Sequence, residues 1–187
     1  MNFLAHLWLA ERTGTSLAGS VLGDVVRGAD LSAYPDDIAV GIRLHRRIDA
    51  VTDRHPAVGA LRAQFPDGAR RYAGIVLDLA FDHALALDWP RYSGDALPDF
   101  CARAGRAVAD AAHWFERAGG RRSSAASFAA LLLSYAEPAG IDRAIARTAA
   151  RLRQPQALLD AGRAWPSRLP ALRSALPPLL ETLAATY

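Results

Sequence analysis

Several residue types are scarce or missing in this chain of 187 residues. Lysine is absent, so all 22 basic residues are arginine, and Cys101 is the one cysteine. A lone cysteine excludes an intramolecular disulfide and gives no support for an oxidising compartment. Runs of β-branched residues and alternating strand patterns are also rare, whereas alanine and leucine are abundant. This composition predicts an all-α fold.

Long apolar runs are missing too. No segment approaches the ~20 apolar residues that a membrane span needs. The apolar stretch Phe3–Ala10 is interrupted by His6 and followed by Glu11, and no basic segment precedes it, which disfavours a secretory signal. We therefore expect a cytoplasmic protein without a membrane span.

The charge is modest, because 22 arginines are offset by 19 acidic residues, which leaves a formal net charge of +3. Codon usage alone could explain the arginine bias, but clustered arginines also bind acidic or phosphorylated partners through paired hydrogen bonds. The local concentrations are Arg43, Arg46, Arg47, Arg70 and Arg71. Basic motifs interleaved with aromatic residues are absent, so we expect no nucleic-acid partner.

The chain shows no long linker and no internal repeat, so we expect residues 1–187 to form a single compact helical domain. Capping residues and prolines set the expected boundaries, with Ser16 and Asp67 as N-caps and Pro177-Pro178 kinking or interrupting the last helix. The expected helices cover residues 2–11, 16–27, 35–52, 56–66, 67–87, 96–118, 124–136, 139–153, 155–165 and 168–185.

The chemistry-bearing residues follow helical steps of four in the first half of the chain. Residues four apart lie on one face of a helix, so a pair can be directed at a common point. These steps are Asn2/His6, His45/Asp49/Asp53 and Asp78/Asp82, with His83 beside the last pair. Buried carboxylates are costly unless strong donors or a cation stabilise their charge, and a divalent metal is a common partner.

Each of these features also has a structural explanation. His6 could be a hydrogen-bonded core residue, and Asp24 could pair with Arg27. The His45/Asp49/Asp53 face could be solvated, with Asp–Arg pairs that contribute little stability. Segment 75–85 is nearly all apolar and therefore predicted to be buried, so its aspartates and His83 favour metal or catalytic use over an Asp–Arg network. No nucleophile elbow, P-loop or dinucleotide-binding glycine pattern is present.

Short motifs follow one another in the first 90 residues. They are Met1-Asn2-Phe3-Leu4-Ala5-His6-Leu7, Gly23-Asp24-Val25-Val26-Arg27-Gly28, Gly41-Ile42-Arg43-Leu44-His45-Arg46-Arg47-Ile48-Asp49, Thr52-Asp53, Leu77-Asp78 and Asp82-His83. This ordered set resembles the acyl carrier protein phosphodiesterases, over a motif-bearing part at 1–90, while the helical remainder at 91–187 matches less densely.

The resemblance implies an all-α fold distantly related to the HD-domain phosphohydrolases. It further implies a divalent metal, Mn²⁺ in the first place and Mg²⁺ or Fe²⁺ as alternatives. The implied reaction hydrolyses holo-acyl carrier protein, an acidic protein substrate, to apo-acyl carrier protein and 4′-phosphopantetheine.

The resulting hypothesis assigns more metal-ligand candidates than one ion needs, so some would orient imidazoles or a second ion would bind. These candidates are His6, Asp24, His45, Asp78, Asp82 and His83. Asp24 or Asp49 could position the attacking water as a base, and Arg27 and Arg46 could stabilise the transition-state charge. An HD domain carries its signature in the order His-Asp, whereas this chain has Asp82-His83, so the ligand set is not transferred from HD proteins in general.

Two alternatives remain open. The first is another metal-dependent phosphohydrolase that acts on nucleotides or small phosphoesters. The second is a helical protein without enzymatic activity that binds acyl carrier protein and whose carboxylates are paired with arginines.

Overall fold

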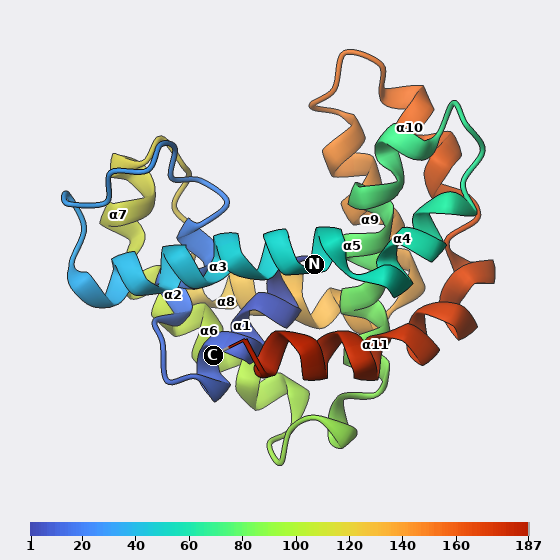
Figure 1. Cartoon of the computed structure of the whole chain (residues 1–187). Coiled ribbons are helices and arrows are strands. Elements are labelled where there is room, and N and C mark those ends of the chain that lie inside the picture. The colour runs from blue at the N-terminus through green and yellow to red at the C-terminus, as the bar shows by residue number, and fades with distance from the viewer. Residues whose placement is uncertain (187) are drawn as a thin grey trace.

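The computed structural model describes residues 1–186, and these residues form an all-α fold without strands (Figure 1). Three short 3₁₀ turns, at Trp89–Arg91, Ser134–Ala136 and Pro166–Arg168, join some of the helices. The α-helices are α1 (Phe3–Arg12), α2 (Leu17–Leu22), α3 (Asp36–Arg54), α4 (Pro56–Ala63), α5 (Arg70–Leu87), α6 (Leu97–Asp110), α7 (Ala112–Arg117), α8 (Ala125–Leu133), α9 (Pro138–Ala149), α10 (Pro155–Gly162) and α11 (Leu169–Ala184).

Local sequence signals explain where several helices begin. The Ser16 hydroxyl accepts a hydrogen bond from the Gly19 N–H at 3.1 Å and so caps α2. Helix α3 starts directly after Pro35 with Asp36 and Asp37, which place negative charge at the positive end of the helix dipole. The expected helix starts at Ser16 and Pro35 are therefore confirmed.

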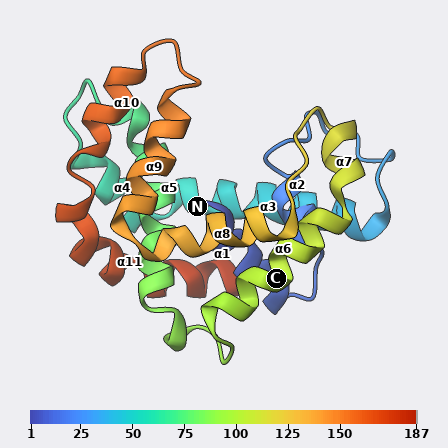
Figure 2. The same ribbon diagram turned by 180° about the vertical axis from the view of Figure 1, so that it is seen from behind.

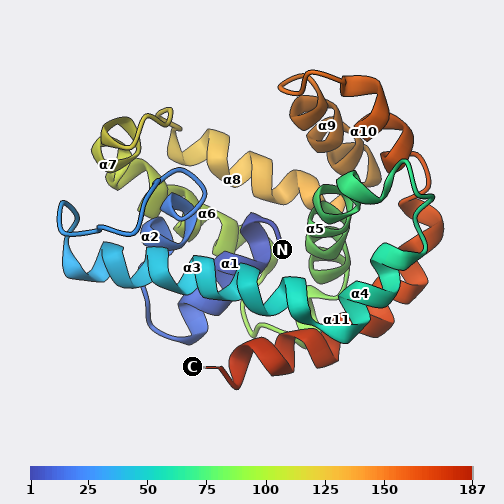
Figure 3. The same cartoon turned by 45° about the horizontal axis from the view of Figure 1, so that its top comes forward.

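The helices surround the first turn of α1. Seen with the top of the molecule turned forward, the N-terminal end of α1 lies between α3, α8 and α5 (Figure 3). Helix α2 packs along α3 and α6 packs along α8, while α5 contacts α4, α9, α10 and α11. The view from behind shows α8 crossing in front of α1 (Figure 2). Residues at the start of α1 are thus placed where helices from both halves of the chain meet.

Two glycines allow α2 and α3 to approach closely. A methyl group on Gly41 would lie 2.8 Å from the Gly19 Cα atom and 2.8 Å from the Ser16 carbonyl oxygen. Only residues without a side chain fit at such a distance. This close contact brings the end of α2, and Asp24 after it, beside the face of α3 that carries His45.

Some boundaries differ from those expected. Helix α2 ends at Leu22, not near Arg27, because the chain turns at Gly23 and leads into a loop. Asp67 does not cap α5, which begins at Arg70, and instead pairs with Arg70 at 2.9 Å. Helix α11 runs through Pro177 and Pro178, so it is not interrupted there, and the kink expected as the alternative stays a prediction.

The apolar face of α11 explains why the two prolines are tolerated. Leu172, Leu176, Leu179 and Leu183 recur at helical spacing, are all fully buried, and belong to a helix that packs on α5 and α4. Burial of such a stripe stabilises a helix by more than two lost hydrogen bonds cost it. Within residues 1–186, no helix is both long and apolar enough to cross a lipid bilayer.

Candidate metal centre

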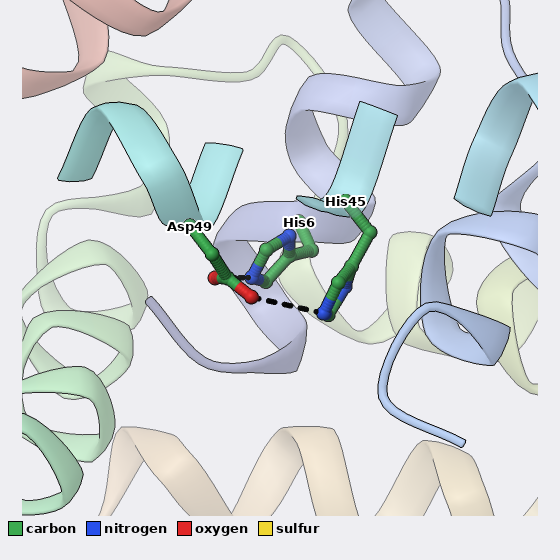
Figure 4. Close-up of side chains that lie close together, drawn as sticks. All are labelled: His6, His45 and Asp49. Atoms are coloured by element: carbon green, nitrogen blue, oxygen red, sulfur yellow. Dashed lines mark ion pairs between the residues drawn. The ribbon is translucent and has the colours of Figure 1, made fainter. Parts of the chain in front are cut away.

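His6, His45 and Asp49 lie close together, with His6 on α1 and the other two on successive turns of α3 (Figure 4). The Asp49 Oδ1 atom lies 3.1 Å from His6 Nε2, and its Oδ2 atom lies 3.2 Å from His45 Nε2. One ligand atom from each residue falls within 4.8 Å of the other two. A single carboxylate thus bridges two imidazoles that come from different helices.

Asp24 adds a second carboxylate to the group. Its Oδ1 atom lies 3.4 Å from His45 Nε2. The imidazoles of His6 and His45 are buried, whereas the side chains of Asp24 and Asp49 are 49% and 45% exposed. The cluster therefore has a buried histidine side and an open carboxylate side, through which a substrate could reach it.

The cluster shifts the proton affinities of its members. Burial opposes the charge of Asp49, but hydrogen bonds from His45 and His6 hold the pKa of its carboxyl well below the usual range. Burial would likewise lower the pKa of His45, but Asp24 and Asp49 outweigh it and raise that pKa to about 9. Burial lowers the pKa of His6, despite its hydrogen bond with Asp49. At neutral pH one imidazole is therefore neutral and the other carries a proton between two carboxylates.

This donor set fits a divalent cation. Imidazole nitrogens combined with carboxylate oxygens suit Mn²⁺, Fe²⁺ or Zn²⁺. The Nδ1 atoms of His6 and His45 are buried and have no hydrogen-bond partner among the described residues, whereas His6 Nε2 also lies 2.9 Å from the Met1 carbonyl oxygen, to which it can donate. A divalent cation bound here would replace the proton on His45 Nε2 and the contact of His6 Nε2 with the Met1 carbonyl.

Gly23 makes room for the His45 ring. A methyl group at this position would overlap the Cβ and ring atoms of His45, which are not the flexible end of a side chain. Gly23 is therefore the residue that allows the His45 ring to lie beside Asp24. This role of Gly23 was not predicted from the sequence, although a glycine stands directly before Asp24.

The structure places the other expected ligands on different partners. The Asp78 Oδ1 atom lies 3.1 Å from the Met1 amino group, which is also 3.8 Å from Asp49. Both Asp82 oxygens accept backbone N–H groups at the start of α1, from Leu4 at 2.7 Å and from Ala5 at 3.2 Å.

The imidazole of His83 turns towards the second half of the chain. Its Nδ1 atom lies 2.7 Å from the Tyr135 carbonyl oxygen, and its ring meets Trp165 edge to face. The contacts of Asp78, Asp82 and His83 are thus structural in this geometry, and their assignment as ligands stays a prediction.

The two arginines expected at the site also differ in their contacts. The Arg46 guanidinium donates to the Val26 carbonyl at 3.0 Å and so holds the loop that follows Asp24. Arg27 is exposed and makes no hydrogen bond or ion pair within residues 1–186.

Asp53 pairs with Arg62 at the end of α3. Burial raises the pKa of the Cys101 thiol to about 12, which makes it a poor nucleophile.

The family model described as "Acyl carrier protein phosphodiesterase" matches residues 1–176. Three similar proteins carry that same name. The one from Photorhabdus laumondii is 47% identical over 104 residues, which are 54% of this chain and 51% of the relative. The one from an Enterobacter species is 46% identical over 110 residues, 58% of this chain and 57% of the relative. The one from Pectobacterium atrosepticum is 49% identical over 89 residues, 48% of this chain and 46% of the relative.

These alignments have a limited extent, since the chain spans about half the length of the curated relatives that it matches. No solved structure matches the chain significantly. The family model, in contrast, extends over almost the whole sequence, including the helices after α5. The chain therefore belongs to the acyl carrier protein phosphodiesterase family.

Proposed function

We propose that this protein is a metal-dependent phosphodiesterase that hydrolyses holo-acyl carrier protein to apo-acyl carrier protein and 4′-phosphopantetheine. The observation that carries the proposal is the convergence of His6, His45 and Asp49, whose ligand atoms lie within 4.8 Å of one another. Family membership and the name shared by the relatives support the choice of substrate.

The proposed reaction breaks the bond between phosphorus and the serine oxygen of the carrier protein. The oxygen of a water molecule bonds to phosphorus, one water proton leaves to a base, and the serine oxygen takes up a proton. The phosphate stays on the pantetheine. A divalent metal supplies positive charge that neutralises phosphoryl oxygens and makes water a stronger nucleophile near neutral pH.

In this scheme His6, His45 and Asp49 hold the cation. Asp49 suits the role because its carboxylate stays ionised and lies between both imidazoles. We assign Asp24 as the base that orients the water, since its half-exposed carboxylate contacts His45 and faces the open side of the cluster. Asp24 is also close enough to the cluster to be a ligand of the ion. Separate measurements of reaction rate and of metal content in a variant at Asp24 distinguish a base from a ligand.

The proposed partner is an acidic protein, and the net charge of this chain is +3. Complementary charge steers two proteins into contact and raises the rate of association. Arg43 is exposed on α3, the helix that carries His45 and Asp49, and is available to contact such a partner.

Mass spectrometry of holo-acyl carrier protein after incubation with the protein and Mn²⁺ tests the reaction. We expect loss of the whole phosphopantetheine group, no loss in the presence of a chelator, and a decrease of about 100-fold or more in kcat/KM for Asp49→Asn. Intact holo-carrier protein combined with hydrolysis of nucleotides would overturn the assignment of the substrate. Hydrolysis that persists fully under chelation would overturn the metal dependence.

Metal analysis separates the enzyme from a protein that only binds the carrier. We expect about one equivalent of Mn²⁺ per chain by equilibrium dialysis. Binding of the carrier protein without metal uptake and without hydrolysis would contradict the proposed enzyme.

A further inference from the structure

Two cavities meet beside the candidate metal centre. The larger has a volume of about 640 Å³ and the smaller one of about 450 Å³. They share five lining residues, namely Phe3, Asp24, Val25, Leu131 and Arg151. Because Asp24 lies 3.4 Å from His45 Nε2, both cavities open next to the cluster.

The two cavities differ in their chemistry. The larger is lined mainly by apolar side chains from several helices, including Val21 on α2, Val108 on α6 and Phe128 on α8, and also by polar residues such as Arg121, Arg122 and Ser123. The smaller is lined by polar groups as well, among them Arg147 and Thr148 at the end of α9. The larger cavity forms the more apolar part of the cleft, both parts contain arginines, and Asp24 lies where they join.

Arg147 and Arg151 supply the positive charge of the smaller cavity. Both are exposed, and neither forms an ion pair with a carboxylate within residues 1–186. In the larger cavity Arg122 pairs with Glu116 at 2.7 Å, whereas Arg121 is exposed and forms no ion pair within residues 1–186. Two arginines without carboxylate partners at the mouth of a cavity favour an anion with several acceptor oxygens, such as a phosphate.

The apolar part of the cleft fits the remainder of such a ligand. A pantetheine arm is a linear chain with two methyl groups on one carbon, a hydroxyl, two amides and a thiol. It needs a long slot with apolar walls and a few hydrogen-bonding groups. Phe3, Val25, Phe128 and Leu131 provide the walls, and Ser123 provides a hydroxyl. These lining residues come from both halves of the sequence.

We propose that this cleft is the binding site of the phosphopantetheine arm, with Arg147 and Arg151 binding its phosphate and the larger cavity holding the pantetheine chain. This inference rests on the proposed function and extends it to residues outside the motif-bearing first half. In this proposal Arg147 and Arg151 make the cleft selective for a phosphorylated arm, and neither arginine contacts a histidine in the structure.

Calorimetric titration of the full-length protein tests the cleft apart from catalysis. The probes are 4′-phosphopantetheine and pantetheine, and a chelator removes any contribution of a metal to phosphate binding. We expect the wild-type protein to bind the phosphorylated probe about tenfold or more tightly than pantetheine. In Arg147→Gln/Arg151→Gln this preference should vanish. Arg143→Gln, an exposed arginine on α9 that lines neither cavity, is the matched control and should keep it.

The apolar part is tested with a residue that lines both cavities. Leu131→Trp should weaken the binding of both probes about tenfold or more, because the larger side chain fills the cleft. Ala130→Trp, at an exposed neighbouring position that lines neither cavity, should change neither affinity.

Specific results would overturn the inference. Equal affinity of the wild-type protein for both probes, or an unchanged preference in the double variant, would exclude Arg147 and Arg151 as the phosphate site. Unchanged affinities in Leu131→Trp would exclude the cleft. Failure of the proposed function gives a different pattern, in which both probes bind as expected and holo-carrier protein stays intact.

Discussion

The imidazole rings of His6 and His45 are stacked, with centroids 4.0 Å apart and planes inclined by 18°. One ring belongs to α1 and the other to α3, so this contact fixes the position of the two helices at the site. Stacking also turns the Nε2 edges of both rings to the same side, where Asp49 lies (Figure 4). Two like imidazoles in such contact are stabilised by a shared anion, or by a shared cation that both coordinate.

Replacement of the bridging carboxylate should separate metal binding from folding. We expect Asp49→Asn to bind Mn²⁺ at least about tenfold more weakly than the wild-type protein, because an amide oxygen carries no net charge. Equilibrium dialysis measures this, and circular dichroism checks the helix content. Asp53→Asn is the control, since Asp53 lies one turn further along α3 and pairs with Arg62. Equal weakening in both variants would contradict the assigned ligand.

The proton affinity of His45 is a second test. In metal-free protein, NMR titration of the imidazole should give a pKa of about 9, because the charges of Asp24 and Asp49 outweigh the effect of burial. Asp24→Asn and Asp49→Asn should each lower this pKa towards 6.5, since each removes one neighbouring charge. A His45 pKa that does not respond to either substitution would show that the ring is not held between the two carboxylates.

Gly23→Ala should disturb the site through sterics alone. The added methyl group overlaps the His45 ring, so we expect the ring to move and Mn²⁺ affinity and kcat/KM to fall by about tenfold or more. Gly59→Ala is the matched control on α4, where a methyl group meets no atom within 4 Å. That control should leave metal affinity unchanged and raise stability by up to about 1 kcal/mol. Full metal affinity in Gly23→Ala would show that the site does not need the space that Gly23 leaves for the His45 ring.

Asp82→Asn should act on stability more than on metal binding. An amide can serve only one of the two N–H groups that the carboxylate accepts, so we expect a loss of about 1–3 kcal/mol in the free energy of unfolding. Urea unfolding measures the loss, and Asp99→Asn, an exposed residue on α6, is the control. If Asp82 instead ligates the metal, its replacement should abolish Mn²⁺ binding.

The same variant should change how stability depends on pH. Burial raises the pKa of Asp82 to about 7 from 3.8, although hydrogen bonds from Leu4 and Ala5 oppose the shift. The folded state therefore binds this proton more tightly than the unfolded state does, and the stability gained from protonation is lost as pH rises from about 4 to about 7. The wild-type protein should show this decline relative to Asp82→Asn. Parallel curves for the two proteins across that range would contradict it.

Salt should slow the proposed reaction with the acidic carrier protein. We expect kcat/KM to fall steadily as NaCl is raised from low to physiological ionic strength, because screening weakens steering between charged proteins. A small phosphodiester such as bis(4-nitrophenyl) phosphate serves as the control and should respond much less. A kcat/KM for the carrier protein that stays constant across the salt series would show that charge does not steer its association with this protein.

Sequence patterns predicted most helices because their signals are local. Ser16 and Pro35 mark helix starts through bonds and torsion angles that involve only the next few residues. Pro177 and Pro178 misled the prediction, since their cost is local while the compensating burial of Leu176 and Leu179 depends on packing against other helices. Tertiary contacts of this kind are not visible in one sequence.

For the site, the step of four between His45 and Asp49 predicted that the two side chains share one face of α3, where they lie 3.2 Å apart. The same reasoning showed that Asp82 and His83 would be buried and would need partners. It could not show that these partners are backbone groups of α1 and of Tyr135, because periodicity gives the face of a helix and not what lies opposite. Arg147 and Arg151 left no signal, since arginines are common throughout the second half of the chain.

The hydrogen bond from Leu4 to Asp82 has a consequence for the order in which the protein acquires its site. His6, Asp24, His45 and Asp49 all lie within the first 49 residues, but the donor and acceptor of this bond are 78 positions apart. A peptide that ends after α3 contains every member of the cluster and lacks the carboxylate on which the first turn of α1 rests. The chain segment between α1 and α5 must close before Asp82 can support the first turn of α1, so we expect the complete centre to require the helical assembly through α5 and not α1 to α3 alone.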